Sequence, residues 1–121
     1  MKIENIKFKA KRLDGKGWAI GDLLHSYENG AIIVPIEGGG AFSVDPSTVC
    51  QFTGLKDCKG NKIWEHDLIH FVGYKPTAEV FLSEEDYAFM AASENEPLYW
   101  LSEVLEIGKI ERVGNKFDNE K

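Results

Sequence analysis

The sequence predicts a mainly-β protein built around a small sheet or barrel, with at most one short helix. Short apolar runs are separated by turn residues about every eight to twelve positions, which is the spacing of small all-β folds. β-Branched and aromatic residues are frequent in these runs, as expected for strands. The length of 121 residues leaves room for one domain, or for one domain with a small appended subdomain.

Strict alternation of apolar residues with lysines marks the first expected strand. Alternate side chains of a strand point to opposite faces, so Ile6, Phe8 and Ala10 should face the core and the lysines between them solvent. Asn29-Gly30 is typical of a tight hairpin. The glycines at 38–40 could nest an anion, but no helix signal follows them, which favours a flexible loop. Further strands are expected at residues 18–24, 31–34, 42–44, 49–53, 63–64, 68–72, 98–101 and 107–113.

Residues 78–92 allow two interpretations. Ser83 and the acidic residues after it could cap a short helix that its alanines favour. Alternatively, residues 79–82 and 87–92 form the two strands of a hairpin around a polar loop. About ten residues before Pro97 make only a marginal helix.

The charge of the chain is uneven. The formal net charge is −6; residues 77–121 hold 11 acidic and 4 basic side chains, a net of −7, and residues 1–76 hold 9 and 10, a net of +1. An acidic protein has no general attraction for nucleic acid, because that attraction comes from Lys and Arg displacing counterions. The acidic third is expected to form a solvated face.

The sequence also predicts a cytoplasmic location. No apolar run follows Met1 that is typical of a signal peptide. The longest apolar stretches, such as residues 31–36, have about six residues against the ~20 that span a bilayer. A membrane is therefore not an expected partner. Cys50 and Cys58 match no zinc pattern and are expected to be reduced thiols.

No catalytic motif is present, so no enzyme activity and no cofactor are predicted. The sequence contains no nucleophile elbow, phosphate loop or dinucleotide fingerprint. His66 and His70, with Glu65 and Asp67, form the one cluster that resembles a metal site. On a strand the two histidines would lie about 13 Å apart, too far for one ion whose ligands each lie ~2 Å away. No metal site is predicted.

Two surfaces are candidates for binding. A basic stripe on the first strand, near Trp18, Phe52 and Trp64, could hold a single nucleic-acid strand, although strand lysines also discourage edge-to-edge aggregation. Aromatic residues beyond the needs of one small core could lie in an interface. The candidate nucleic-acid contacts are Lys7, Lys9, Lys11 and Arg12, and the candidate interface residues are Tyr87, Phe89, Tyr99 and Trp100.

A distinctive motif lies in the middle of the chain. Gln-Phe-Thr-Gly-Leu-Lys-Asp over residues 51–57 is followed by Trp-Glu-His-Asp over 64–67, and the end of the chain carries Glu-Ile-Gly-Lys-Ile over 106–110. With the opening strand, these segments resemble the YopX family of phage and prophage proteins over roughly residues 3–113. The residues expected to form a structural motif are Gln51, Phe52, Thr53, Gly54, Leu55, Asp57, Trp64, Glu65 and Asp67.

The resemblance implies a fold, but it provides no activity, cofactor or partner that could be transferred to this chain. It implies an SH3-like β-barrel over residues 51–113, with an N-terminal β subdomain over 1–50 before it. Residues 114–121 are polar, which predicts a flexible tail. The resemblance also favours the hairpin between 78 and 92. The family usually has Gly where this chain has His66, so the turn there must form differently or the loop must shift.

The motif also has a physical interpretation of its own. A carboxylate before a strand can accept backbone N–H bonds and fix the turn that starts the strand, and Thr53-Gly54 should supply a kink. The expected function is a phage-derived, self-associating interaction or assembly module without catalysis, which contacts a phage or host protein partner through its aromatic and acidic surface. Open strand edges favour pairing between copies. The alternative is a nucleic-acid-binding accessory protein that uses the basic first strand.

Overall fold

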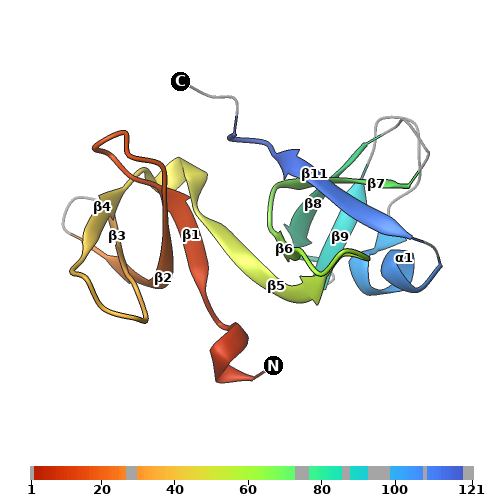
Figure 1. Ribbon diagram of the computed structural model, residues 1–121, viewed down its shortest axis with the longest axis horizontal. Coiled ribbons are helices and arrows are strands. Elements are labelled where there is room, and N and C mark those ends of the chain that lie inside the picture. Colours follow the sequence, from red (N-terminus) through yellow and green to blue (C-terminus); the bar gives the residue numbers. More distant parts are fainter. Residues whose placement is uncertain are drawn as a thin grey trace. The chain divides into compact units, whose positions relative to one another are not determined.

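The computed structural model confirms a mainly-β protein with one short α-helix among its described residues (Figure 1). The chain divides into two compact units, residues 1–52 (unit 1) and residues 53–121 (unit 2). The structure describes residues 2–26, 30–72, 77–85, 88–92, 99–107 and 109–118. The expected hairpin dipeptide Asn29-Gly30 therefore lies partly outside the described residues.

Unit 1 is made of short antiparallel strands. The sheet order is β4-β3-β2-β1-β5-β6, and strand β5 contains the boundary between the units. The elements are η1 (Ile3–Asn5), β1 (Phe8–Lys11), β2 (Trp18–His25), β3 (Ala31–Val34), β4 (Phe42–Val44), η3 (Pro46–Thr48) and β5 (Cys50–Lys56). All four strands predicted in this region before β5 are present, with ends within one or two residues of those expected.

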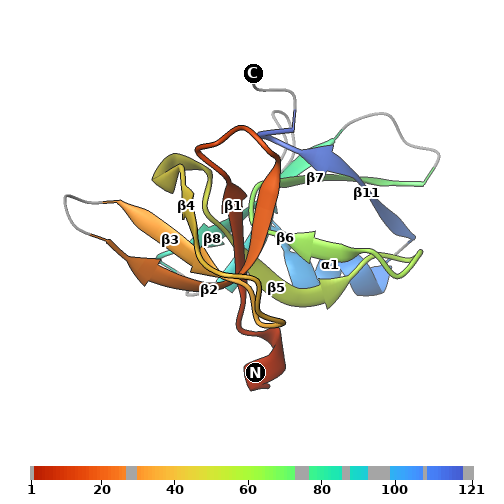
Figure 2. The ribbon, with the colours of Figure 1, turned by 60° about the vertical axis from the view of Figure 1, so that its left-hand side comes forward.

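The strands of unit 1 curl around a core of small side chains. β2 pairs with β1 along its first half and with β3 along its second half, and Figure 2 shows β2 and β3 side by side. A bridge between Arg12 and Val44 brings β4 back to the end of β1. The buried core residues are Ala10, Ala19, Ala31, Ile33 and Val44.

The predicted faces of β1 need one correction. Ala10 is buried and Phe8 packs against the core, as expected, but Ile6 is 44% exposed and Lys9 is only 6% exposed. The Lys9 ammonium lies 4.5 Å from the centre of the Trp18 ring. A lysine stem is apolar and its cation is attracted to an aromatic face, so the side chain packs instead of extending into solvent.

Unit 2 is built on an antiparallel sheet of order β10-β9-β8-β7-β11. Its described strands form an open sheet and not a closed barrel, so the SH3-like barrel is a finer statement than the strand pairing supports. The elements are β6 (Lys62–Trp64), β7 (Asp67–Phe71), β8 (Ala78–Ser83), β9 (Ala88–Ala92), β10 (Tyr99–Trp100), α1 (Leu101–Ile107) and β11 (Ile110–Asn115).

The hairpin interpretation of residues 78–92 is confirmed, because β8 and β9 pair from Glu79–Ala92 to Ser83–Ala88. The helix lies instead at α1, between two segments predicted as closing strands. Leu101 and Val104 are buried in the core and Leu105 packs against it. This i, i+3, i+4 spacing is that of a helix face. The buried core residues are Ile63, Ile69, Val80, Ala91, Leu101, Val104 and Ile110.

The end of the chain is more ordered than predicted. The segment predicted as a tail from Gly114 contains Asn115 and Phe117, which are 2% and 8% exposed. The Asn115 side-chain oxygen accepts the Phe117 N–H, and the Asp118 carboxylate accepts the Asn115 N–H. The fold therefore continues through Asp118, and residues 119–121 lie outside the described residues.

Candidate functional site

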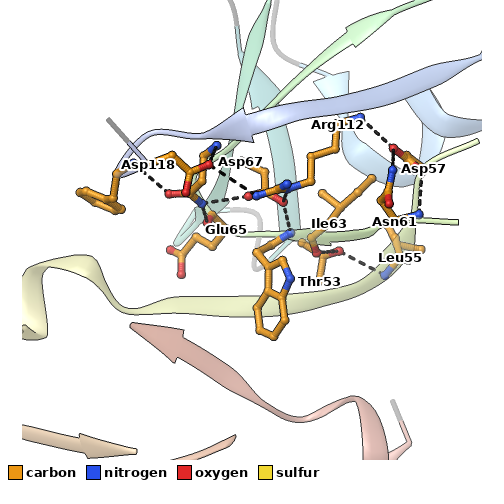
Figure 3. A network of polar contacts seen from close by, with 12 residues as sticks. Thr53, Leu55, Asp57, Asn61, Ile63, Glu65, Asp67, Arg112 and Asp118 are labelled. Atoms are coloured by element: carbon orange, nitrogen blue, oxygen red, sulfur yellow. Dashed lines mark hydrogen bonds and ion pairs between the residues drawn. The ribbon is translucent and has the colours of Figure 1, made fainter. Parts of the chain in front are cut away.

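The predicted motif forms a network of polar contacts in unit 2 (Figure 3). Its first part is at the start of the unit, where Gly54 has a φ of 83°. The Thr53 hydroxyl donates to the Ile63 carbonyl at 2.7 Å and accepts the Leu55 N–H at 3.1 Å. Thr53 thus bridges the bend that Gly54 permits, and the kink predicted there is present.

Asp57 organises the turn between β5 and β6 and also holds the edge of β11. Its carboxylate accepts the backbone N–H groups of Lys59 and Asn61 at 2.9 and 2.8 Å, and that of Arg112 at 2.8 Å. Burial by itself raises the pKa of Asp57, but the N–H bonds from Arg112, Asn61 and Lys59 outweigh it, so the pKa lies below its usual value. Strand β11 is at the edge of the sheet, and the Arg112 N–H points away from β7. The Asp57 carboxylate accepts this backbone donor, which would otherwise be exposed on the open edge.

Asp67 is the fully buried centre of the network. One carboxylate oxygen accepts the Trp64 N–H at 2.7 Å and the Arg112 Nε–H at 2.9 Å, and the other accepts the Asn115 amide at 2.9 Å. The Asn115 amide also reaches the Glu65 carbonyl at 3.3 Å. Figure 3 shows Arg112 extending from β11 over Asp67. A buried carboxylate needs such partners, because an unpaired buried charge is very costly.

The turn before β7 is formed by His66, a residue with a side chain. His66 has a φ of 69°, the one positive φ among the described non-glycine residues. Its N–H donates to the Val80 carbonyl at 2.6 Å and its carbonyl accepts the Lys116 N–H at 2.9 Å. The ring lies 3.3 Å from a Glu79 carboxylate oxygen and contacts the edge of Phe117. These contacts hold the His66 backbone in a conformation that glycine adopts more readily than a residue with a Cβ.

A second group of charges ties β7, β11 and the β5–β6 turn together. Glu111 contacts His70 Nε2 at 2.6 Å and Lys59 Nζ at 2.7 Å. The side-chain bonds from Lys59 and His70 lower the pKa of Glu111, and Glu111 raises the pKa of Lys59. His66 and His70, from the cluster for which no metal site was predicted, thus contact different carboxylates.

The two carboxylates of the network are taken up by bonds within the fold. Asp67 has no exposed surface, and Asp57 is 7% exposed with both oxygens bonded. Within the part of the chain that the structure describes, no group of three or more His, Cys, Asp or Glu residues is placed to hold a metal ion. The Cys50 thiol is buried and donates to the Thr48 carbonyl at 3.2 Å, whereas Cys58 is exposed.

The candidate nucleic-acid contacts lie on aromatic rings in unit 1. Lys7 is 5.0 Å from the Phe52 ring centre, and Arg12 is 4.1 Å from that of Phe42. Lys9 and Lys11 share the Trp18 ring. The predicted closeness of this stripe to Trp18 and Phe52 is therefore present. The rings are covered by the protein's own cations.

Of the four candidate interface residues, the structure describes the side chains of two, which differ in exposure. Trp100 is 48% exposed, whereas Phe89 packs against the core of unit 2. Tyr87 and the side chain of Tyr99 lie outside the described residues. The Tyr99–Ala91 and Trp100–Met90 pairs fix the register of β10 on β9.

The remaining motif residues are also placed in the fold. Gln51 pairs with Phe8 across β5 and β1, and Phe52 and Trp64 are buried. The sequence analysis missed two partners in the network, Arg112 and Asn115. A single arginine in a strongly acidic third is a signal that a buried carboxylate will need it. Nothing local marks Asn115, which follows Gly114 in a segment that looks like a polar tail.

Fold and site together define the class: a small two-unit β-protein whose distinctive motif holds turns and strand edges in place. The chain belongs to the YopX family, since the family model described as YopX protein matches residues 7–121. The resemblance is confirmed and reaches beyond residue 113, to the end of the chain. No curated protein and no solved structure matches it. No helix in the described part of the chain is long and apolar enough to span a membrane.

Proposed function

We propose that this YopX-family protein is a phage-derived, non-catalytic interaction module of the cytoplasm that associates with copies of itself. The observation that carries the proposal is an apolar face on unit 1, opposite its core. Ile20 and Leu24 on this face of β2 are 48% and 53% exposed. Leu24 lies beside Ile32 and Asp22 beside Val34 on β3. Lys9 lies opposite Ile20, so charged residues border these apolar side chains. Apolar patches that polar residues border are typical of interaction sites.

A non-catalytic role is supported by the state of the buried carboxylates. The carboxylate oxygens of Asp57 and Asp67 accept hydrogen bonds from backbone and side-chain donors of the fold. A general acid or base needs a carboxyl group that reaches substrate in a cleft. In unit 2 we further propose an SH3-like architecture, supported by the β7-β8-β9-β10 meander, the short helix after it, and the return of β11 to β7.

The mass of the particle in solution tests self-association. We expect gel filtration with light scattering to give a defined oligomer, and Ile20→Glu or Leu24→Glu to shift it toward the 13.6 kDa of the single chain. Ile36→Glu is a matched control, because Ile36 is 63% exposed but lies outside the strands. A wild-type monomer at all concentrations would sink the proposal.

The alternative, nucleic-acid binding by Lys7, Lys9, Lys11 and Arg12, is an outcome of the same experiment. The row of four cations supports it. Lys9 and Lys11 already lie over the Trp18 ring and Arg12 over the Phe42 ring, which weighs against stacking of bases on these rings. Protein purified without nuclease would then show a high ratio of absorbance at 260 to 280 nm. The bound nucleic acid would be lost steeply as salt rises.

A further inference from the structure

Strand β2 changes its partner halfway along. Residues 18–21 pair with β1, and residues 22–25 pair with β3. β2 lies between these two strands in the sheet, so β1 and β3 lie on opposite sides of it. The second half of β2 therefore has one side that β1 does not reach.

Two residues present their backbone groups to that side. The Ser26 N–H donates to the Gly30 carbonyl, which continues the register of β2 on β3. Because successive residues of a strand direct their N–H and C=O groups to alternate sides, Asp22 and Leu24 also bond toward β3. Leu23 and His25 direct theirs away from β3, toward the side where β1 would continue.

The chain before β1 does not fill this position. The last β1–β2 pair is Phe8 with Gly21. Residue Ile6 donates its N–H to the Ile3 carbonyl, because the chain turns into η1, the short coil at the N-terminus in Figure 2. Among the described residues, no backbone bond from outside the strands reaches Leu23 or His25.

We propose that this open edge of β2 pairs with the same edge of a second copy across a two-fold axis at Leu24, which makes the two sheets continuous. The proposal rests on the self-association proposed above and names its surface. Leu23 would bond the partner's His25, and His25 the partner's Leu23. An axis at Leu23 instead would need the backbone groups of Gly21, which already face β1.

Side chains and charge favour a second copy as the occupant. Leu24, 53% exposed, would lie against the partner's Leu24 and extend the apolar row that begins at Ile32 on β3. Asp22 would lie opposite the partner's Ser26, so no like charges meet. Unit 1 holds six acidic and six basic residues, a net of zero, so two copies of it do not repel. Closed two-fold dimers are the commonest protein oligomers.

Disulfide trapping tests the position of the axis. Across such an axis the two Leu24 residues form a non-hydrogen-bonded pair with Cα atoms ~4.5 Å apart, within reach of a disulfide. In a Cys58→Ser background, we expect Leu24→Cys to give a covalent dimer on mild oxidation. Ile20→Cys is the matched control, since Ile20 is 48% exposed on the same face but would lie about 26 Å from its own copy.

A second variant blocks the edge without changing the core. His25 is exposed and its N–H faces the open side, where proline is tolerated at a sheet edge. We expect His25→Pro to keep the circular dichroism spectrum of the wild type and to raise the dissociation constant of the dimer at least tenfold.

The outcomes separate the two proposals. Wild-type protein that stays a monomer overturns both. An oligomer in which Leu24→Cys gives no covalent dimer, or in which Ile20→Cys gives as much, overturns the β2 edge alone. So does an oligomer that His25→Pro leaves intact. Trapping at Leu24 at least tenfold above that at Ile20, together with loss of the dimer in His25→Pro, supports the edge.

Discussion

Unit 1 and unit 2 are stabilised in different ways. Three of the five buried core residues of unit 1 are alanines, so its strands approach closely and little apolar volume is enclosed. The core of unit 2 is formed mainly by Ile, Leu and Val, which bury more area per residue. The comparison predicts that unit 1 is most sensitive to added volume.

The two units also differ in the contacts that their charged residues make. In unit 1 the lysines of β1 and the lysine before it lie over the rings of Phe52 and Trp18. In unit 2 the carboxylates of Asp57 and Asp67 are buried and accept bonds from turns and from β11. Unit 2 also carries 14 acidic and 8 basic side chains, a net of −6. Unit 2 should therefore be most sensitive to the loss of a single polar group.

The largest effect is expected from Asp67→Ala. The substitution removes the carboxylate to which the Trp64 N–H, the Arg112 Nε–H and the Asn115 amide donate. Breaking a buried charged pair costs about 3–5 kcal/mol of unfolding free energy. Urea denaturation followed by circular dichroism measures the change. Asp14→Ala is the control, because Asp14 pairs with Arg12 at the surface, where solvent screens an ion pair and little stability is lost with it. Equal losses in both variants would show that the network does not stabilise unit 2.

Gly21→Ala should have the next largest effect, in unit 1. A Cβ atom at Gly21 would lie 2.2 Å from the Val34 carbonyl oxygen, so β2 and β3 must separate. Overpacking of this kind costs about 1–3 kcal/mol, measured as a lower urea midpoint. Gly114→Ala in unit 2 is the matched control, since its Cβ would meet only the Asp118 carboxylate at 3.6 Å. A similar loss at Gly114 would contradict the view that close strand approach is special to unit 1.

Unit 1 was the easier part to predict from sequence. Alternation and turn residues located its strands because both are local signals. The face of Lys9 was not predictable in this way, since its packing depends on Trp18 from the next strand. In unit 2 the motif indicated that a carboxylate before the strand at 68–72 fixes the turn, and Asp67 accepts the Trp64 N–H there. Its partner Arg112 lies 45 residues further along the chain, a separation that no local pattern encodes.

The helix α1 shows a different limit. A window of four apolar residues near Leu101 is compatible with either a strand or a helix. The structure uses the helix spacing of Leu101, Val104 and Leu105 because all three side chains contact the core of unit 2. Tertiary packing thus decided between two local readings of similar quality.

Acid should loosen unit 2 before unit 1. The folded-state pKa of Asp57 lies below its unfolded value of about 3.9. The stability that it contributes is therefore fully present above pH 4 and is lost as pH falls through the folded-state pKa. Glu111 has a shift of the same sign. We expect the urea midpoint, measured at pH values from 6 to 2.5, to stay constant down to about pH 4 and to decrease at lower pH.

Asp57→Asn isolates this contribution. The amide cannot carry the charge that the N–H groups of Arg112, Asn61 and Lys59 favour, so the variant should be less stable at pH 6 and lose less stability on acidification. Asp45→Asn in unit 1 is the control, since Asp45 caps η3 at the surface. If Asp57→Asn kept the full acid dependence of the wild type, another group would be responsible.

The smallest expected effect concerns His66, whose backbone is the one described exception to glycine at positive φ. His66→Ala removes the ring contacts with Glu79 and Phe117 and keeps the left-handed backbone. His66→Gly removes the same contacts but also removes the backbone strain. For a residue with a Cβ, the left-handed conformation costs about 1–2 kcal/mol. Thermal denaturation should therefore find His66→Gly more stable than His66→Ala by about 1 kcal/mol. The same pair of substitutions at Lys62, an exposed strand residue, should give the opposite order, because glycine weakens a strand. If alanine were the more stable at both positions, the turn would have relaxed, and the contacts of the His66 ring would be what holds its backbone in the left-handed region.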